Sequence, residues 1–322
     1  MSALQAPTID DVRRARDRIK DAAVRTPLLP VEQDAGGARV HLKLENLQPI
    51  GSFKLRGALN KMLAAPRASL ADGVYTASAG NMAHGVAWAA RSLGVAATVF
   101  VPDSAPQTKT DAVKRLGATV VPVPYDEWWQ IMQNHGRSDT PGLFVHPFAD
   151  GDVLAGNGTI ALEILEDCPD VDAVLVPWGG GGLACGIAAA LRALRPSARV
   201  YACEVEGAAP LTASIAAGKP VEIKNKHTFI DGIGGRGVFP DIWPLARELI
   251  TGALTVAERQ VADAIGFLAQ RARIVAEGAG AVPLAAARAH VLTPTPSHMV
   301  CVVSGGNIDL SMLATILSGL IP

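Results

Sequence analysis

The feature that most constrains the fold is a regular alternation of short apolar runs with longer segments of helical periodicity, which begins at Gly73. Short apolar runs of this kind have the length of buried strands, and the intervening segments have the length of helices. The expected strands are 73–77, 97–101, 118–123 and 143–148, and the expected helices are 82–93, 107–117 and 126–136. Strands that alternate with helices favour right-handed βαβ units and a parallel sheet.

A second alternating series follows Asp150, and we find no internal repeat or low-complexity linker. Its expected strands are 171–178, 198–204 and 298–304, and its expected helices are 152–167, 183–196, 257–273, 280–291 and 308–319. Thr8 can cap a first helix that runs to about residue 23. The two series predict an α/β fold with two open, twisted, mostly parallel sheets flanked by helices, and a ligand site in the cleft between them.

Charge and composition exclude several function classes. The 322 residues carry a net charge of −1, which gives no electrostatic reason to expect binding to nucleic acid or a membrane. The amino-terminal segment lacks the apolar core of a signal peptide, and no apolar run reaches membrane-spanning length. The four cysteines lie far apart and are expected to be buried free thiols: Cys168, Cys185, Cys203 and Cys301. A cytoplasmic location is therefore expected.

Lys54 stands in the segment Gly51–Gly57, between a short strand pattern and a helix pattern. A partly desolvated amine at the positive end of a helix has its charged form disfavoured, which suits a nucleophilic or Schiff-base lysine. The alternative is an ordinary surface lysine near a helix start.

Residues 179–182 are four consecutive glycines between an expected strand and an expected helix. Their backbone N–H groups can surround an anion without obstruction by side chains, and the helix dipole adds to the attraction. A phosphate dianion is the natural ligand, and a tight strand–helix turn is the alternative. A dinucleotide-binding fingerprint is not completed here.

Two further loops follow strand ends. Ser304 leads into Gly305-Gly306-Asn307, and the residues 78–81 form the sequence Ser-Ala-Gly-Asn before a helix. Strand ends in open parallel sheets face the ligand crevice, and a helix start can hold a carboxylate. Both loops could instead serve as helix caps.

Together these motifs resemble the pyridoxal 5'-phosphate (PLP) enzymes of the serine/threonine dehydratase and serine racemase family. The motifs at 51–57, 78–81, 158–165, 179–182 and 304–307 follow the family's order and cover nearly the whole chain. The resemblance implies fold type II (tryptophan-synthase β-like), a homodimer, a large domain of 1–64 and 150–322, and a small mobile domain of 65–149. The chain stops soon after the last motif, which indicates the dehydratase branch without a regulatory domain.

The resemblance also implies a role for each matched residue. Lys54 would hold PLP covalently and act as the catalytic base, Ser304 would bond the pyridine nitrogen, and Asn81 the phenolic oxygen. The remaining cofactor contacts would be Phe53, Gly179, Gly180, Gly181, Gly182, Leu183, Gly232 and Glu277. The substrate would be held by Ser78, Ala79, Gly80, Asn81 and Met82.

The sequence departs from the family at several positions. Ala79 replaces the serine that racemases use as a second acid/base, and Met82 and His84 replace the usual histidine and glutamine of the dehydratases. Pro210 replaces an aspartate of the racemase cation site, which leaves Glu204 and the Ala208 carbonyl. One carboxylate makes a poor site for a hard cation, so we expect no metal.

The favoured function is a dehydratase (ammonia-lyase) that converts a β-hydroxy-α-amino acid to a 2-oxo acid and ammonia. Because Met82 is apolar, threonine-like or bulkier substrates, including 3-phenylserine, are expected to outperform serine. A racemase and a β-replacement enzyme are alternatives within the fold, although Leu55 stands where the β-replacement enzymes have an aspartate. A non-catalytic protein that binds PLP or another phosphate ligand is the alternative of another class.

Overall fold

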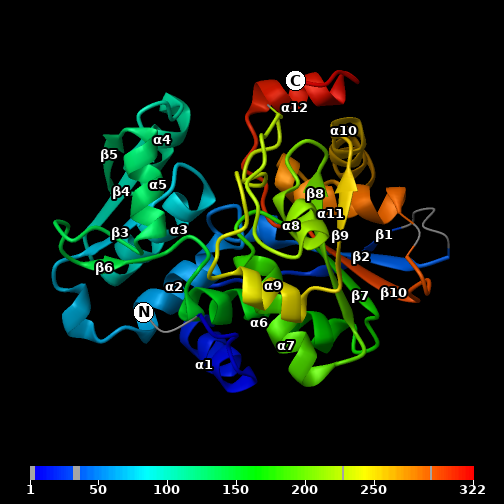
Figure 1. Ribbon diagram of the computed structural model, residues 1–322, viewed down its shortest axis with the longest axis horizontal. Helices are drawn as coiled ribbons and strands as arrows, with labels where there is room; N and C mark the ends of the chain where they lie inside the picture. Colours follow the sequence, from blue (N-terminus) through cyan, green and yellow to red (C-terminus); the bar gives the residue numbers. More distant parts are fainter. Residues whose placement is uncertain (1–3, 32–36, 227, 291) are drawn as a thin grey trace.

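The computed structural model describes residues 4–31, 37–226, 228–290 and 292–322. It is an α/β structure with two separate sheets, a six-stranded and a four-stranded one, each flanked by helices (Figure 1). The four-stranded sheet and its helices form one lobe on the left of Figure 1, and the six-stranded sheet forms a larger lobe on the right. The α/β class and the two mostly parallel sheets predicted from the alternation are confirmed.

The helices follow the expected order along the chain. In the described residues they are α1 (Ile9–Ile19), α2 (Lys54–Ala64), α3 (Asn81–Leu93), α4 (Gln107–Arg115), α5 (Tyr125–Gln133), α6 (Gly151–Asp167), α7 (Gly182–Leu194), α8 (Pro210–Ala217), α9 (Trp243–Leu249), α10 (Glu258–Phe267), α11 (Gly278–Ala289) and α12 (Leu310–Leu317). Short 3₁₀ segments are η1 (Glu45–Leu47) and η2 (Arg67–Leu70), and η3 (Leu268–Ala272) is a π-helical turn. No helix of these described ranges is long and apolar enough to cross a bilayer.

The strands divide cleanly between the two sheets. The larger sheet contains β1 (Leu28–Val31), β2 (Arg39–Lys43), β7 (Ala173–Pro177), β8 (Arg199–Val205), β9 (Gly252–Val256) and β10 (His298–Val302), in the order β1-β2-β10-β7-β8-β9. The smaller contains β3 (Val74–Ala77), β4 (Ala97–Pro102), β5 (Thr119–Val123) and β6 (Leu143–Phe144), in the order β5-β4-β3-β6. All pairs are parallel except β1 with β2.

Helix α2 lies between the two lobes, packed on α3 and on α6 (Figure 1). Glycines allow these contacts. A Cβ on Gly156 of α6 would lie 2.5 Å from the carbonyl oxygen of Arg56, and one on Gly85 of α3 would lie 3.1 Å from that of Lys54. Because backbone approaches backbone on both sides, the position of Lys54 is fixed by main chain rather than by flexible side chains.

A buried ionic network also holds α2. Arg56 is 2% exposed and donates to both Glu45 and Glu163, with nitrogen–oxygen distances of 2.6–2.9 Å. Lys43 Nζ lies 2.5 Å from Glu163 Oε2 and 2.5 Å from the Thr26 carbonyl oxygen. Burial disfavours the charge on Arg56, but the two carboxylates outweigh this effect and keep its pKa above the usual value. The cations Arg56 and Lys43 therefore balance the charge of the two buried glutamates next to the first turn of α2.

Several boundaries differ from the sequence prediction. The first helix ends at Ile19 rather than near residue 23, although the Thr8–Asp11 capping box forms as expected. The run 143–148 is a strand only at Leu143–Phe144, because the His146 ring accepts hydrogen bonds from the following backbone and turns the chain. The sequence prediction missed β1, β9, α8 and α9, and Val291, at the end of one expected helix, lies outside the described residues.

Candidate active site

Lys54 is the first residue of α2, and its amine is buried. Its Nζ donates to the Pro147 carbonyl oxygen at 2.7 Å and lies 5.1 Å from the centre of the Phe53 ring. Burial lowers the pKa of Lys54 to about 8, while the charge of Glu277 acts in the opposite direction. A lysine with this pKa is far more often neutral near physiological pH than an exposed one, so it can act as a nucleophile or a base.

The lysine loop is paired with the loop that contains Ser304. Phe53 N donates to the Ser304 carbonyl oxygen at 3.0 Å, Gly306 N donates to the Gly51 carbonyl oxygen at 2.9 Å, and Ser52 and Gly305 form a β-bridge. Two motifs separated by some 250 residues of sequence thus become one backbone unit. Ser304 is buried as a residue, and its hydroxyl makes no hydrogen bond to another group of the described part of the chain.

Glu277, Asn81 and Asn307 form a hydrogen-bonded chain beside this unit. Asn81 Nδ2 donates to Glu277 Oε1 at 2.7 Å, and Asn307 Nδ2 donates to Asn81 Oδ1 at 2.7 Å. Burial raises the pKa of Glu277 to about 8, and the hydrogen bond from Asn81 only partly offsets it. A Cβ on Gly305 would overlap Glu277 Oε1, so a glycine is required where the carboxyl group meets the Ser304 loop. The structure therefore places Asn81, Glu277 and Ser304 around one small volume.

This pKa shift makes the pH dependence of stability testable in the cofactor-free protein. The folded pKa of Glu277 is about 8 and its unfolded pKa about 4.5, so the folded state holds an extra proton between these values. The contribution of Glu277 to the free energy of unfolding is therefore fully present below pH 4.5 and is lost as pH rises through 8. Relative to Glu277→Gln, the wild type should lose up to about 1.4 kcal/mol of unfolding free energy per pH unit in this window. Urea titrations of both proteins between pH 5 and 8 measure the unfolding free energy. Parallel curves of this free energy against pH would contradict the raised pKa of Glu277.

The tetraglycine loop joins β7 to α7. Two of its glycines are required by their surroundings or their backbone conformation. A Cβ on Gly179 would lie 2.6 Å from the Gly232 carbonyl oxygen, and Gly181 has a φ of +86°, which favours glycine. A Cβ on Gly180 would overlap the Phe148 ring. Within the described residues, none of the four glycine N–H groups donates a hydrogen bond to another protein atom. Close packing accounts for the glycines, and the free N–H groups leave the loop able to bind an anion.

These groups fit a phosphate-bearing aldehyde cofactor of the PLP type. The unpaired N–H groups of residues 179–182 suit the phosphate, the unpaired Ser304 hydroxyl suits a ring nitrogen, and the Lys54 amine suits the aldehyde carbon. Phe148 contacts the glycine loop and directly follows Pro147, whose carbonyl oxygen binds Lys54. The glycine loop and the Lys54 amine are thus connected through residues 147 and 148, and the Ser304 loop joins them through its backbone bond from Phe53.

The other predicted cofactor residues lie close to this unit. Gly232 has a φ of +85° and touches Gly179 through its carbonyl oxygen. Leu183 is buried in the same hydrophobic cluster as Phe53, directly after the glycine loop. Phe53 contributes its ring below the lysine amine.

The predicted carboxylate loop, residues 78–81, lies between β3 and α3. Ser78 Oγ accepts a hydrogen bond from Gly80 N at 3.2 Å, Ala79 is half-buried, and a Cβ on Gly80 would face open space. Met82 differs from what the substrate hypothesis requires. Its side chain is 1% exposed and packs in the core of the four-stranded lobe, so its thioether does not line the loop.

His146 is a site residue that the sequence analysis missed. It is 1% exposed, and its Nδ1 accepts hydrogen bonds from Phe148 N at 3.1 Å and Ala149 N at 2.8 Å. Burial lowers the pKa of His146 to about 3, so the ring is neutral. The turn it stabilises directs the Pro147 carbonyl towards Lys54. A histidine before proline at the end of an apolar run was the available signal.

Glu204, the remaining acid of the cation site considered from sequence, has other partners. Its carboxylate accepts hydrogen bonds from Leu211 N, Thr212 N and Thr212 Oγ1 at 2.7–2.8 Å. These groups belong to the first turn of α8, so Glu204 stabilises the start of that helix.

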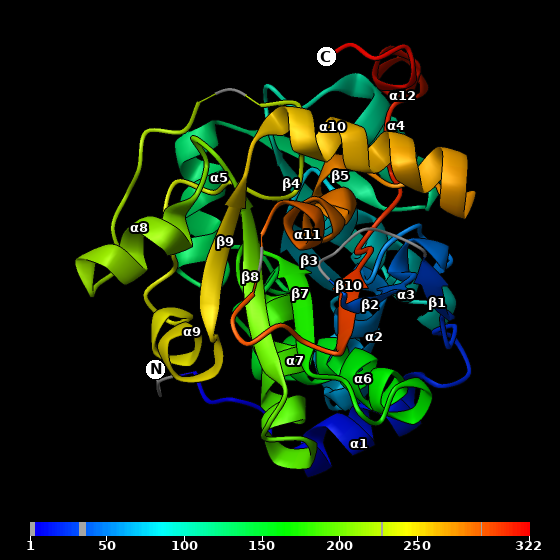
Figure 2. The same cartoon turned by 90° about the vertical axis from the view of Figure 1, so that its right-hand side faces the viewer.

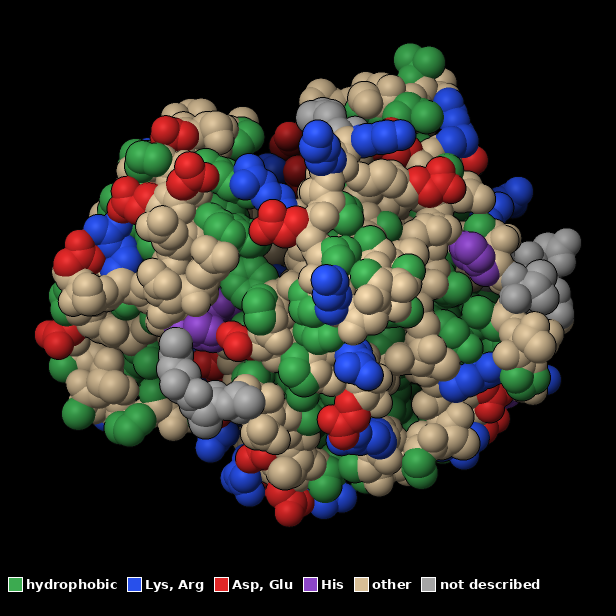
Figure 3. All heavy atoms as spheres, in the orientation of Figure 1, with side chains coloured by type: hydrophobic (Ala, Val, Ile, Leu, Met, Phe, Trp, Pro, Cys, Tyr) green, Lys and Arg blue, Asp and Glu red, His purple; other side chains and the backbone are tan. Residues whose placement is uncertain are grey.

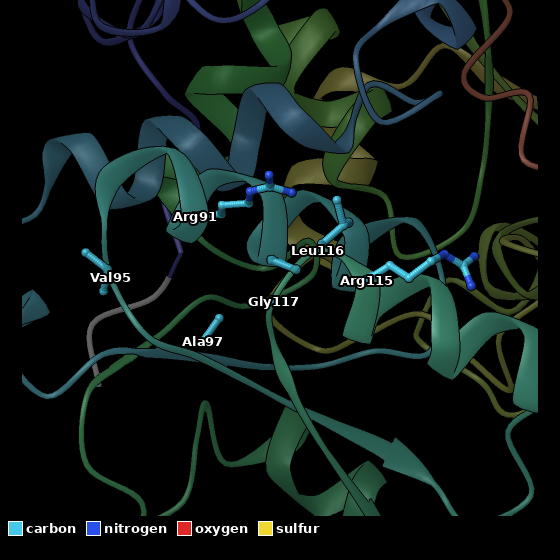
Figure 4. A pocket seen from close by; sticks show the side chains of 7 residues that line it. Arg91, Val95, Ala97, Arg115, Leu116 and Gly117 are labelled. Atoms are coloured by element: carbon cyan, nitrogen blue, oxygen red, sulfur yellow. The ribbon is translucent and has the colours of Figure 1, made fainter.

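The surface is hollowed between the two lobes above this region (Figure 3). A separate pocket lies on the four-stranded lobe, where α3 and α4 end (Figure 4). It is lined by Ala87, Arg91, Val95, Ala97, Arg115, Leu116 and Gly117. None of these residues belongs to the loops around Lys54, so this pocket is not the candidate active site.

Comparison with known proteins agrees with the geometry. A family described as "Pyridoxal-phosphate dependent enzyme" matches residues 19–305. The chain is 42% identical over 309 residues to an L-threonine ammonia-lyase of Geobacter sulfurreducens, covering 95% of this chain and 77% of that protein. It is 35% identical over 324 residues to a serine racemase of Arabidopsis thaliana, covering 96% and 95% respectively. A solved maize serine racemase superposes with a TM-score of 0.90 at 31% identity, covering 98% of each chain. The chain therefore belongs to the pyridoxal-phosphate dependent enzyme family.

Proposed function

We propose that this protein is a PLP-dependent dehydratase, an ammonia-lyase that converts a threonine- or serine-like β-hydroxy-α-amino acid to a 2-oxo acid and ammonia. The observation that carries the proposal is the Lys54 amine, with a pKa near 8, within the unit formed by the lysine, glycine and serine loops. The similarity to a protein named L-threonine ammonia-lyase supports the same reaction class.

In this proposal PLP, when bound, supplies the electron-withdrawing ring that makes the substrate Cα–H acidic. Lys54 removes the Cα proton and holds it on Nζ, beside the Pro147 carbonyl oxygen. It can return that proton to the departing β-hydroxyl, which leaves as water. The N–H groups of the glycine loop hold the phosphate, and the loop at residues 78–81 receives the substrate carboxylate. The neutral Ser304 hydroxyl donates to the ring nitrogen without adding a full charge.

We further propose that substrates with an apolar β-substituent are preferred. Aromatic rings lie beside the Lys54 segment: Phe53 near its amine, and Phe148 with Phe239 at a centroid separation of 4.8 Å. An acidic or hydrogen-bonding β-group would lose its water partners against such a surface, at a cost of about 1–3 kcal/mol. Threonine and 3-phenylserine should therefore outperform serine and 3-hydroxyaspartate.

The test compares kcat/KM for 2-oxo acid formation across these four amino acids in the yellow, PLP-loaded protein. Phe239→Leu should lower kcat/KM for 3-phenylserine more than kcat/KM for serine. Phe267→Leu, on α10, should change kcat/KM for neither substrate. A clear preference for 3-hydroxyaspartate would refute the apolar pocket. Absence of 2-oxo acid from every substrate would instead favour a non-catalytic PLP protein.

Racemisation is the second candidate, because proteins named serine racemase are also similar to this chain. A two-base racemase needs a proton donor on the face opposite the lysine, and Ala79 has no exchangeable proton. We expect little inversion of L-serine by the wild type and measurably faster inversion by Ala79→Ser. Chiral chromatography of the serine measures both. Rapid inversion by the wild type would replace the dehydratase proposal.

A matched pair of variants tests the phosphate role of the glycine loop. Since any side chain at Gly180 meets Phe148, both variants are made in a Phe148→Ala background. Gly180→Asp places a negative charge beside the phosphate, while Gly180→Asn has the same size and no charge. The aspartate variant should bind PLP at least tenfold more weakly than the asparagine variant, as measured by equilibrium dialysis. Equal affinities would show that the loop is a packing turn only.

The predicted division into residues 1–64 with 150–322, and a small mobile unit of 65–149, is also part of the proposal. The four-stranded sheet is built from residues 74–144, and ion pairs Lys109–Asp231 and His135–Asp241 connect it to the other lobe. Such partly exposed pairs contribute about 0–1 kcal/mol each, so movement of this unit would be opposed mainly by the packing of α3 on α2. A homodimer and a cytoplasmic location remain predictions, to be tested by sedimentation and cell fractionation.

A further inference from the structure

Three potential metal ligands converge at the end of the six-stranded sheet opposite Ser304. His41 lies on β2, His298 is the first residue of β10, and Cys168 caps the carboxyl end of α6. One ligand atom from each residue lies within 4.8 Å of the other two. Because His298 begins the strand that leads to Ser304, this cluster and the lysine site lie at opposite ends of β10.

The two histidines have unsatisfied nitrogens. Nδ1 of His41 and Nδ1 of His298 are both buried and have no hydrogen-bond partner among the residues that the structure describes. Their rings stack with centroids 5.9 Å apart and an interplanar angle of 15°. A buried polar atom without a partner is energetically unfavourable, and a bound ion or water is the usual explanation for one. Two such atoms in adjacent rings indicate a ligand that both rings can share.

The Asp170 carboxylate lies next to Cys168 and His298. Its Oδ1 accepts from Cys168 Sγ at 3.5 Å, and its Oδ2 lies 3.1 Å from His298 Nε2. The carboxylate can therefore reach an ion held by the thiol and the imidazoles, or orient those ligands by hydrogen bonding.

We propose that His41, Cys168 and His298 bind one divalent transition-metal ion of the zinc or cobalt class, with Asp170 completing a four-ligand site. Two imidazole nitrogens, one thiolate and one carboxylate form a donor set that Zn²⁺ accepts in tetrahedral geometry. The thiolate and imidazoles select against Mg²⁺ and Ca²⁺, which require oxygen ligands.

Binding of the metal requires the thiolate form of Cys168 and neutral imidazoles. A sulfur–metal bond forms, the S–H bond of Cys168 breaks, and one proton passes to the buffer for each ion bound.

The site would connect three elements at the end of the sheet. Residue 41 pairs with Val300 and residue 298 pairs with Arg39 in the same ladder, and Cys168 ends the helix that packs on α2. Binding should therefore raise the stability of the fold without contributing a group to the chemistry at Lys54.

The experiment titrates the untagged, PLP-loaded protein with Co²⁺. We expect one ion per chain, with visible d–d bands at wavelengths longer than the cofactor absorption, and loss of those bands when Zn²⁺ is added. Calorimetry in buffers of different ionisation enthalpy should show release of about one proton per ion.

Three variants locate the ion. Cys168→Ser and His298→Gln should each weaken Co²⁺ binding at least tenfold and abolish the metal-dependent rise in thermal midpoint. His290→Gln removes a half-buried ring that bonds Thr255 outside the cluster, and should change neither property. PLP absorbance and turnover, unchanged in all three, report that the variants fold. Absence of 1:1 binding in the wild type, or binding that survives in both cluster variants, would overturn the proposal.

Discussion

Lys54→Ala is expected to abolish turnover and the covalent attachment of PLP. The variant removes both the attachment point and the proposed base, and the loss of a positioned proton-transfer group alone costs about 10²–10⁴-fold in rate. Borohydride reduction of the wild type should fix the cofactor on the peptide that contains Lys54, and mass spectrometry identifies it. The variant should yield no reduced adduct.

Lys61→Ala is the matched control, since Lys61 lies on the same helix two turns further along. It pairs with Asp150 at 2.8 Å and with Asp152 at 3.2 Å, so its amine is engaged in partly buried ion pairs away from the Lys54 amine. Its loss should leave turnover within about twofold, because it removes no group that contacts Lys54. A reduced adduct on any lysine other than Lys54 would contradict the assignment.

Arg56→Met is expected to cause the largest loss of stability. It leaves the carboxylates of Glu45 and Glu163 buried, with Lys43 as the remaining cation. Removing one partner from a buried ionic group typically costs about 3–5 kcal/mol, because the other charges stay desolvated. Urea unfolding followed by circular dichroism measures the change in unfolding free energy.

Two further variants separate charge from packing at this position. Arg56→Lys keeps the charge but loses the planar fork that contacts both carboxylates, so its loss should be intermediate. Arg13→Met removes an exposed partner of Asp10 on α1 and should change stability by less than about 1 kcal/mol. A loss for Arg56→Met no larger than that for Arg13→Met would show that the network contributes nothing.

The sequence predicted the parts of the fold that have a clear period. Buried parallel strands such as β3 and β7 are short apolar runs, and the helices between them carry a 3.6-residue pattern, so the α/β class followed directly. Strand β1 contains Pro30 and pairs antiparallel at the sheet edge, and β9 has only one fully buried residue. The proline of β1, and the glycine and threonine within β9, weaken the signal of a central strand.

The candidate site was predictable motif by motif but not as an arrangement. The resemblance to known dehydratases indicated Asn81 and Glu277 separately, yet their hydrogen bond spans 196 positions of sequence and depends on the tertiary fold. For Met82 the motif was misleading. Its place in the motif predicted a side chain that lines the pocket, but the side chain packs in the core. The support that His146 gives to the lysine depends on backbone bonds, of which the sequence shows only a histidine before a proline.

The position of β10 has a consequence for how the chain folds. This strand, near the carboxyl end, lies between β2 and β7 and hydrogen-bonds to both, so the six-stranded sheet remains in two pieces until residues 298–302 arrive. The four-stranded sheet needs only residues 74–144 and can form while the rest of the chain is still being synthesised. Closing the larger sheet requires contacts across some 250 residues, so we expect this to be the slow step of folding. The enzyme therefore acquires its lysine pocket last, when β10 docks and brings the Ser304 loop against Phe53.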